Sequence, residues 1–121
     1  MNPSGKKIAA NFYRTSNGGE PVREWLLKLD IADRKTVGKD IQKVEFGWPV
    51  GMPYSKPLGQ GLYEVRSNLS DRRIARVIFF TRENQMVLLH GFVKKSQKTP
   101  RTDLDLAVKR MKEVQNHDRS N

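Results

Sequence analysis

Three β-type runs in the second half of this chain follow one another with only short turns between them. The turns contain Ser70-Asp71 and Glu83-Asn84, which are typical turn residues. Connections this short favour antiparallel pairing. The sequence therefore predicts an antiparallel meander, whose strands run over Leu62 to Asn68, Arg73 to Thr81, and Met86 to Lys94.

Two helices are predicted before the meander. Pro21 suits the first turn of a helix, and an apolar stripe with helical spacing follows it at Val22, Trp25, Leu26 and Leu29. Asp33 is predicted to cap a second helix that ends at Gly47. Its inward residues are Val37, Ile41 and Val44. We expect the two helices to form a hairpin, preceded by a first strand over Lys7 to Arg14.

One loop and one helix complete the predicted domain. Pro and Gly recur from Trp48 to Gly61, which predicts an ordered loop without regular structure. Thr99 is predicted to cap a last helix and Pro100 to open it, before a polar tail over residues 116–121. The stripe of this helix is Leu104, Ala107, Val108 and Met111. The order β-α-α-β-β-β-α predicts a single α+β domain over residues 1–121, with helices packed on an antiparallel sheet and with flexible ends at 1–6 and 116–121.

Composition limits the chemistry that such a domain can carry out. The chain has 23 Lys and Arg against 13 Asp and Glu, a formal net charge of +10. It has no cysteine and two histidines, which excludes a Cys nucleophile and leaves little material for a metal site, so we expect no cofactor. No apolar run approaches the roughly 20 residues of a membrane span, and no signal-peptide core follows Lys6-Lys7. A cytoplasmic protein is expected.

Positive charge is concentrated where the last predicted strand leads into the last helix. The segment from Gly91 to Arg101 contains no acidic residue. Its cations are Lys94, Lys95, Lys98 and Arg101. They cannot all be buried, and no nearby carboxylate neutralises them, so the segment is expected to face a polyanion. Phosphate is the first candidate.

Motifs over about half of the chain resemble a known protein family. The segments Gly47 to Pro53 and Lys56 to Arg66 resemble its proline-glycine loop and its Leu-aromatic-Glu-x-Arg strand, while Arg76 to Phe80 and Leu88 to Pro100 resemble its next two strand motifs. The family is the phage-derived Gp49-like group of HigB-type toxins, within the RelE superfamily of toxin–antitoxin ribonucleases. The resemblance implies a RelE-like toxin of a type II toxin–antitoxin system. Such a toxin cleaves mRNA in the ribosomal decoding site without a metal ion, inhibits translation, and is inhibited by a cognate antitoxin, often a helix-turn-helix protein such as HigA.

Metal-free RNA cleavage needs a base for the 2′-hydroxyl, cations for the phosphorane, and an acid for the leaving 5′-oxygen. Arg66 and Arg76 lie on adjacent predicted strands and can bracket one phosphate with bidentate donors. Lys94 or Lys95 would complete the catalytic cluster, because strand alternation turns one of the two onto the arginine face. Glu64 shares a face with Arg66 and is a candidate base, or only a partner of the arginine.

Other cationic and aromatic residues are assigned to RNA or ribosome binding. They are Lys56, Arg73, Lys98, Arg101 and Tyr54. Structural roles remain open for all these candidates: the strand arginines can pair with Glu64 and Asp71, the lysines can form a solvated turn, and the tyrosine can pack. His90 lies inside an apolar run and is interpreted as a core residue, and His117 is expected at a frayed end.

Two further functions remain open. The basic face can hold RNA or DNA without cleaving it, or an inactive toxin homologue can act through a protein partner. A DNA-binding regulator is less favoured, because no helix pair with helix-turn-helix spacing carries a dense basic face. Catalysis requires Arg66, Arg76 and a lysine around one phosphate, whereas a binding groove spreads them out. An antitoxin segment is expected to cover either the cationic face or the helical pair from Pro21 to Gly47.

Overall fold

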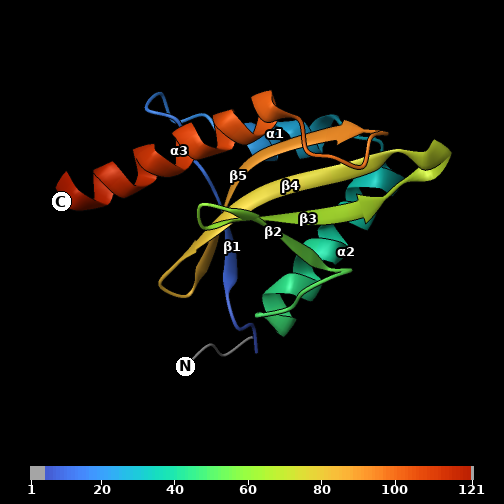
Figure 1. Cartoon of the computed structure of the whole chain (residues 1–121), viewed down its shortest axis with the longest axis horizontal. Helices are drawn as coiled ribbons and strands as arrows, with labels where there is room; N and C mark the ends of the chain where they lie inside the picture. Colours follow the sequence, from blue (N-terminus) through green and yellow to red (C-terminus); the bar gives the residue numbers. More distant parts are fainter. Residues whose placement is uncertain (1–4, 121) are drawn as a thin grey trace.

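The computed structural model describes residues 5–120 as one sheet with helices on both faces (Figure 1). Its elements are β1 (Ala9–Phe12), α1 (Pro21–Lys28), α2 (Ile31–Gly47), β2 (Ser55–Gly59), β3 (Leu62–Asn68), a short 3-10 turn (Ser70–Arg72), β4 (Ile74–Arg82), β5 (Gln85–Lys94) and α3 (Arg101–Ser120). The predicted α+β class is confirmed, and each meander strand lies within one residue of its expected bounds.

The strand order across the sheet is β1-β5-β4-β3-β2. The strands β3, β4 and β5 pair antiparallel as the meander predicted, and β2 extends the sheet antiparallel to β3. The first strand, β1, pairs with β5 in parallel. The sheet is therefore mostly antiparallel, and the central strand is β4.

One strand was missing from the prediction. The segment from Trp48 to Gly61 is not wholly irregular, because β2 forms within it and pairs Lys56 with Glu64. Pro57 interrupts the pattern of a strand in sequence, but β2 lies at the edge of the sheet, where a missing backbone N–H can face outward at no cost. The new strand places Lys56 on the same face of the sheet as Glu64.

The sheet separates two apolar cores. Helices α1 and α2 cover one face, where Val22, Val37, Ile41 and Val44 pack against residues of the sheet such as Val65, Val77 and Phe79. Helix α3 covers the other face, where Ala107 and Met111 pack on Leu62, Ile78, Phe80 and Leu89. Figure 1 shows α3 crossing the sheet on the opposite side from α2. Burial of both faces explains the nearly unbroken apolar run of β4.

Two expected helix ends are corrected. Helix α2 begins at Ile31, so Asp33 is not its cap but a buried residue of its first turn. It lies there because Arg73 of the β3–β4 turn donates to its carboxylate at 3.1 Å. Helix α3 continues to Ser120, past the expected end of the apolar stripe, and its last turns are tied to the sheet hairpin through an ion pair between Asp118 and Arg82.

Candidate functional site

A charged cluster lies on the α3 face of the sheet, across the three meander strands. Arg66 and Arg76 are direct cross-strand partners, and Arg76 is in turn paired with Phe92 on β5. Because alternate residues share a face, Glu64 and Lys94 project from this same face. The ion pair between Lys94 Nζ and Asp103 on α3, at 3.7 Å, agrees with that placement. The register thus puts Lys94, rather than Lys95, on the arginine face.

Glu64 lies at the centre of the cluster. Its side chain has no exposed surface, and its Oε1 atom is 3.6 Å from Arg66 Nε and 3.8 Å from Arg76 Nε. Its Oε2 atom accepts a hydrogen bond of 2.6 Å from the hydroxyl of Thr99. Thr99 was expected to cap α3, but its hydroxyl faces the sheet because this buried carboxylate needs a donor. Glu64 therefore holds the two arginines and the start of α3 together.

Arg76 is the one charged residue in the buried stretch of β4. Its side chain is fully buried, and its guanidinium donates to the backbone carbonyls of Ser96 and Lys98 and lies 5.8 Å from the centre of the Phe92 ring. Burial lowers the pKa of Arg76, an effect that the charge of Glu64 opposes. With no exposed atoms, Arg76 does not meet a phosphate in this conformation, and its contacts fix the loop between β5 and α3.

Arg66 has a different environment. Its side chain is 14% exposed, and its Nη2 atom donates to both the main-chain oxygen and the side-chain oxygen of Gln97, each at 3.1 Å. Gln97 itself is exposed. Arg66 is thus the arginine of the pair that solvent reaches, with a polar, displaceable partner on its guanidinium.

An imidazole lies beside Phe92, the ring that Arg76 also contacts. His90 Nε2 is 2.6 Å from Asp103 Oδ1, and the ring stacks on Phe92 with centroids 5.4 Å apart. The His90 side chain is 17% exposed, so it is not a fully buried core residue as the apolar run around it had indicated. Asp103 also faces Lys94 through its other oxygen. The first turn of α3 therefore brings one carboxylate to both basic groups of β5.

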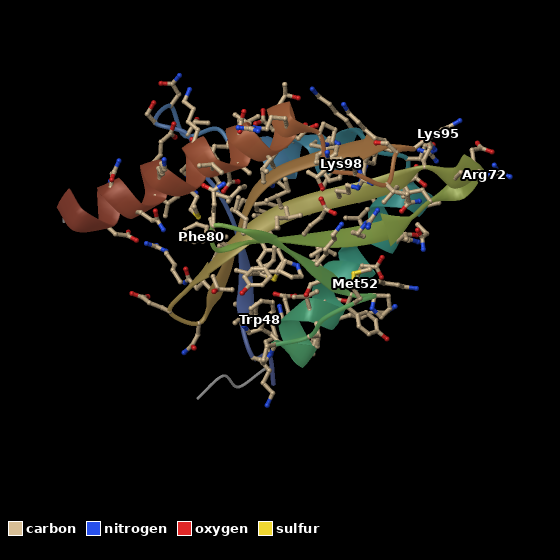
Figure 2. All side chains as sticks on the ribbon, viewed as in Figure 1. Trp48, Met52, Arg72, Phe80, Lys95 and Lys98 are labelled. Atoms are coloured by element: carbon tan, nitrogen blue, oxygen red, sulfur yellow. The ribbon has the colours of Figure 1, made fainter. Side chains whose placement is uncertain are left out.

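The two lysines assigned to RNA binding, Lys56 and Lys98, and the catalytic candidate Lys95 surround this cluster. Lys56 is cross-strand from Glu64, and the exposed Lys95 and Lys98 lie in the loop that the arginines fix (Figure 2). Among residues 5–120, no ion pair occupies any of these three amino groups. They remain available for an anion from solution.

The other assigned binding residues have partners within the fold. Arg73 is held by Asp33 and by the carbonyl and hydroxyl of Ser70. Arg101 is exposed and pairs with Asp105 across one helical turn at 3.4 Å. The ring of Tyr54 is half-exposed and lies 5.6 Å from the amino group of Lys43, near the end of α2.

A separate hollow lies away from this cluster. It encloses about 940 Å³ between the 13–16 segment and the last turns of α3, and its lining includes Arg82, His117 and Asp118. His117 therefore lies within a helix rather than at a frayed end. It is in the last turns of α3, whereas His90 contacts the first turn of that helix through Asp103. Within residues 5–120, no three His, Asp or Glu side chains gather as a metal site would require, and no helix is long and apolar enough to cross a membrane.

Comparison with known families decides the relationship. Residues 24–112 match the family described as "Phage derived protein Gp49-like (DUF891)". The chain belongs to the Gp49-like family. This family is related to the RelE- and HigB-type toxins, so the resemblance in the sequence motifs is confirmed at that level. No curated protein matches the chain at a significant level.

In this Gp49-like chain, the sequence prediction placed His90 in the core, and three further residues of the cluster were absent from the predicted site. They are Asp103, Thr99 as a partner of Glu64, and Gln97. The sequence did hold a signal for Asp103. It lies in the first turn of the helix that follows β5, where an acidic side chain is favoured and is close to the end of the strand. The other two contacts depend on how the 95–99 loop folds back, which no local pattern encodes.

Proposed function

We propose that this Gp49-like protein is the toxin of a type II toxin–antitoxin system and that it cleaves mRNA on the ribosome, inhibiting translation. The observation that carries the proposal is the cluster on the α3 face. It combines one solvent-accessible arginine on β3, an exposed lysine on β5, and an imidazole–carboxylate pair between β5 and α3. Family membership supports the toxin assignment, because the family is related to RelE-type nucleases.

The proposed reaction is attack of the ribose 2′-hydroxyl on the neighbouring phosphorus. A new O–P bond forms, the bond to the 5′-oxygen breaks, and the products are a 2′,3′-cyclic phosphate and a free 5′-hydroxyl. The base removes the proton of the 2′-hydroxyl, and the acid supplies a proton to the leaving 5′-oxygen. Cations around the phosphate stabilise the extra negative charge of the phosphorane.

Each side chain of the cluster has a role in this reaction. Arg66 exchanges the two oxygens of Gln97 for two phosphate oxygens, a substitution that bidentate guanidinium geometry favours. His90 accepts the 2′-hydroxyl proton at the ring nitrogen that Asp103 does not contact. Lys94, 47% exposed, donates to the leaving oxygen and balances the phosphorane charge.

Glu64 and Arg76 act as positioning residues in this proposal. Both are fully buried, so neither contacts the substrate in this conformation. Glu64 sets the position of Arg66, and Arg76 fixes the loop that carries Lys95 and Lys98. These two lysines, with Lys56 and Arg101, hold the RNA backbone or ribosomal RNA, since phosphate contacts position a nucleic acid without reading its sequence. Arg73 and Tyr54 contribute at the margins of this surface.

The same cationic surface suits an inhibitory partner. A cognate antitoxin, of the helix-turn-helix type known as HigA-like, would present an acidic or amphipathic segment that covers the exposed lysines. Charge complementarity would speed its association, and steric exclusion would keep RNA away.

A non-catalytic role is the second candidate, and one observation favours it. Arg76 and Glu64 are sealed from solvent and form an ion pair at 3.8 Å, and Arg76 also donates to the loop, as a structural pair would. The protein would then hold RNA through Lys56, Lys95 and Lys98 without cleaving it.

Induced expression in bacteria separates the two functions. The intact chain, Arg66→Ala, and a control that lacks two exposed lysines of α2, Lys35→Ala/Lys39→Ala, are compared for growth and for new mRNA 5′ ends. We expect arrest and new ends within open reading frames from the intact chain and the control, and neither from Arg66→Ala. Arrest without new ends would favour the binding role, and absence of arrest would oppose the toxin assignment.

A further inference from the structure

A second hollow lies at the end of the sheet, next to the cluster. It encloses about 470 Å³ between the β3–β4 turn and the loop that follows β5. Its lining is Asn68, Leu69, Arg72, Arg73, Ile74, Lys95 and Gln97. Gln97 belongs to both places, because it lines the hollow and also accepts two hydrogen bonds from Arg66. The hollow therefore begins where the cluster ends.

The lining is cationic, and two of its charges have no partner. Arg72 and Lys95 are exposed, and among residues 5–120 neither takes part in an ion pair. Figure 2 shows both at the same end of the molecule, Arg72 on the turn and Lys95 just past β5. No acidic residue is among the residues that line the hollow, so its lining carries a positive net charge.

The turn that presents Arg72 is fixed rather than loose. Asp71 and Arg72 both have left-handed backbone angles, with φ of 59° and 61°. Arg73 holds them in place, since its guanidinium binds Ser70 within the turn and Asp33 on α2. The backbone of this turn is thus held by contacts within the fold, so the ordering that binding requires is limited to side chains such as those of Arg72 and Lys95.

We propose that this hollow binds a backbone phosphate of RNA, adjacent to the phosphate that Arg66 contacts. Arg72 and Lys95 supply the charge, and the amide groups of Asn68 and Gln97 supply neutral donors. The inference rests on the proposed function for the identity of the ligand. The phosphate can come from the substrate strand, as the next nucleotide along, or from ribosomal RNA. In either case the hollow sets the register of RNA on the cluster.

The test measures binding without cleavage. Fluorescence anisotropy follows labelled 2′-O-methyl oligoribonucleotides, which lack the attacking hydroxyl, at several salt concentrations. A dinucleotide with one phosphate is compared with a trinucleotide with two. The variants are Arg72→Ala/Lys95→Ala and the control Lys35→Ala/Lys39→Ala, which removes the same charge from exposed positions on α2. Binding of 70S ribosomes is measured in parallel.

If the phosphate belongs to the substrate, Arg72→Ala/Lys95→Ala weakens trinucleotide binding by about tenfold and flattens its dependence on log salt by about one unit. The dinucleotide and the control are expected to change by less than about twofold. Loss confined to ribosome binding assigns the phosphate to ribosomal RNA. Equal losses for Arg72→Ala/Lys95→Ala and the control, or no loss in any arm, would overturn the proposal.

Failure of the nuclease proposal would be visible separately. If the native chain never cuts mRNA but its affinity for the trinucleotide depends on Arg72 and Lys95, only the catalytic role is refuted. The hollow then remains an RNA phosphate site. If Arg72→Ala/Lys95→Ala cuts mRNA at the same positions as the native chain and binds RNA with the same affinity, only the proposed phosphate site is refuted.

Discussion

Arg66 and Arg76 are directly opposite each other on β3 and β4, yet only one of the two guanidinium groups reaches solvent. Both are within 4 Å of the same carboxylate oxygen of Glu64, at 3.6 and 3.8 Å. Arg76 binds main-chain carbonyls of the 95–99 loop, whereas Arg66 binds the exposed Gln97. The pair therefore divides into an inner residue that supports the site and an outer residue that can meet a ligand.

This division predicts unequal effects on stability. Arg76→Ala leaves Glu64 buried without one of its two cations and removes the donors to Ser96 and Lys98. We expect it to lower the free energy of unfolding by about 3–5 kcal/mol, the cost of removing one partner of a buried ion pair. Arg66→Ala removes a partly exposed group and is expected to cost about 1 kcal/mol. Urea denaturation measures both, and equal losses would contradict the division.

The hydrogen bond from Thr99 to Glu64 is expected to be essential for docking the start of α3. Thr99→Val keeps the shape of the side chain but leaves a buried carboxylate oxygen without its donor, which costs about 1–3 kcal/mol of unfolding free energy. Thr99→Ser retains the hydroxyl and serves as the matched control. If the serine variant lost as much stability as the valine variant, the methyl group rather than the hydrogen bond would carry the effect.

The contact between α1 and β5 requires a glycine. A Cβ atom at Gly91 would lie 2.4 Å from the Trp25 ring, so Gly91→Ala is expected to force the two elements apart at a cost of about 1–3 kcal/mol. Gly38 in α2 has no neighbouring atom within 4 Å of the equivalent position. Gly38→Ala should instead add about 0.5–1 kcal/mol, because Ala favours a helix interior. Thermal melting of the two variants checks the opposite signs.

The folded protein is expected to lose stability at high pH because of Tyr13. Burial, and then its hydrogen bond to Glu113, raise the pKa of Tyr13 above 10.0. A raised pKa means that the folded protein holds this proton more tightly, so the stabilisation is complete below pH 10 and falls as pH rises through the folded pKa. Tyr13→Phe cannot ionise. We expect the gap in unfolding free energy between the native chain and Tyr13→Phe to shrink above pH 10, and a gap that stays constant to pH 11 would refute this.

Much of the fold follows from local patterns in the sequence. The meander strands were predictable because their alternation and turn residues agree, and α1 because Pro21 and its apolar stripe coincide. The edge strand β2 was not, because Pro57 is tolerated only at an edge, and edge position depends on the whole sheet. Asp33 was misassigned as a cap for a similar reason, since its partner Arg73 is distant in sequence.

The site was predictable in its residue types but not in its burial. Strand alternation placed Glu64, Arg66 and Arg76 together, and the register then selected Lys94. Which of the two arginines is buried depends on the 95–99 loop, because carbonyl groups of this loop accept hydrogen bonds from Arg76. The pairing of His90 with Asp103 depends on how α3 crosses the sheet, so the apolar sequence around His90 gave the wrong environment.

The central claim is that the Arg66 side of the cluster cleaves mRNA on the ribosome. Purified protein is mixed with ribosomes carrying a defined mRNA, and the rate of cleavage and the chemical nature of the new ends are measured for the native chain and for Arg66→Ala, with circular dichroism to verify folding. The account predicts that the native chain cleaves the mRNA and leaves a 5′-hydroxyl end. For a folded Arg66→Ala it predicts a cleavage rate at least about a hundredfold lower, which is the effect of losing one donor to a transition-state oxyanion. No cleavage by the native chain, or equal rates for the two, would contradict it.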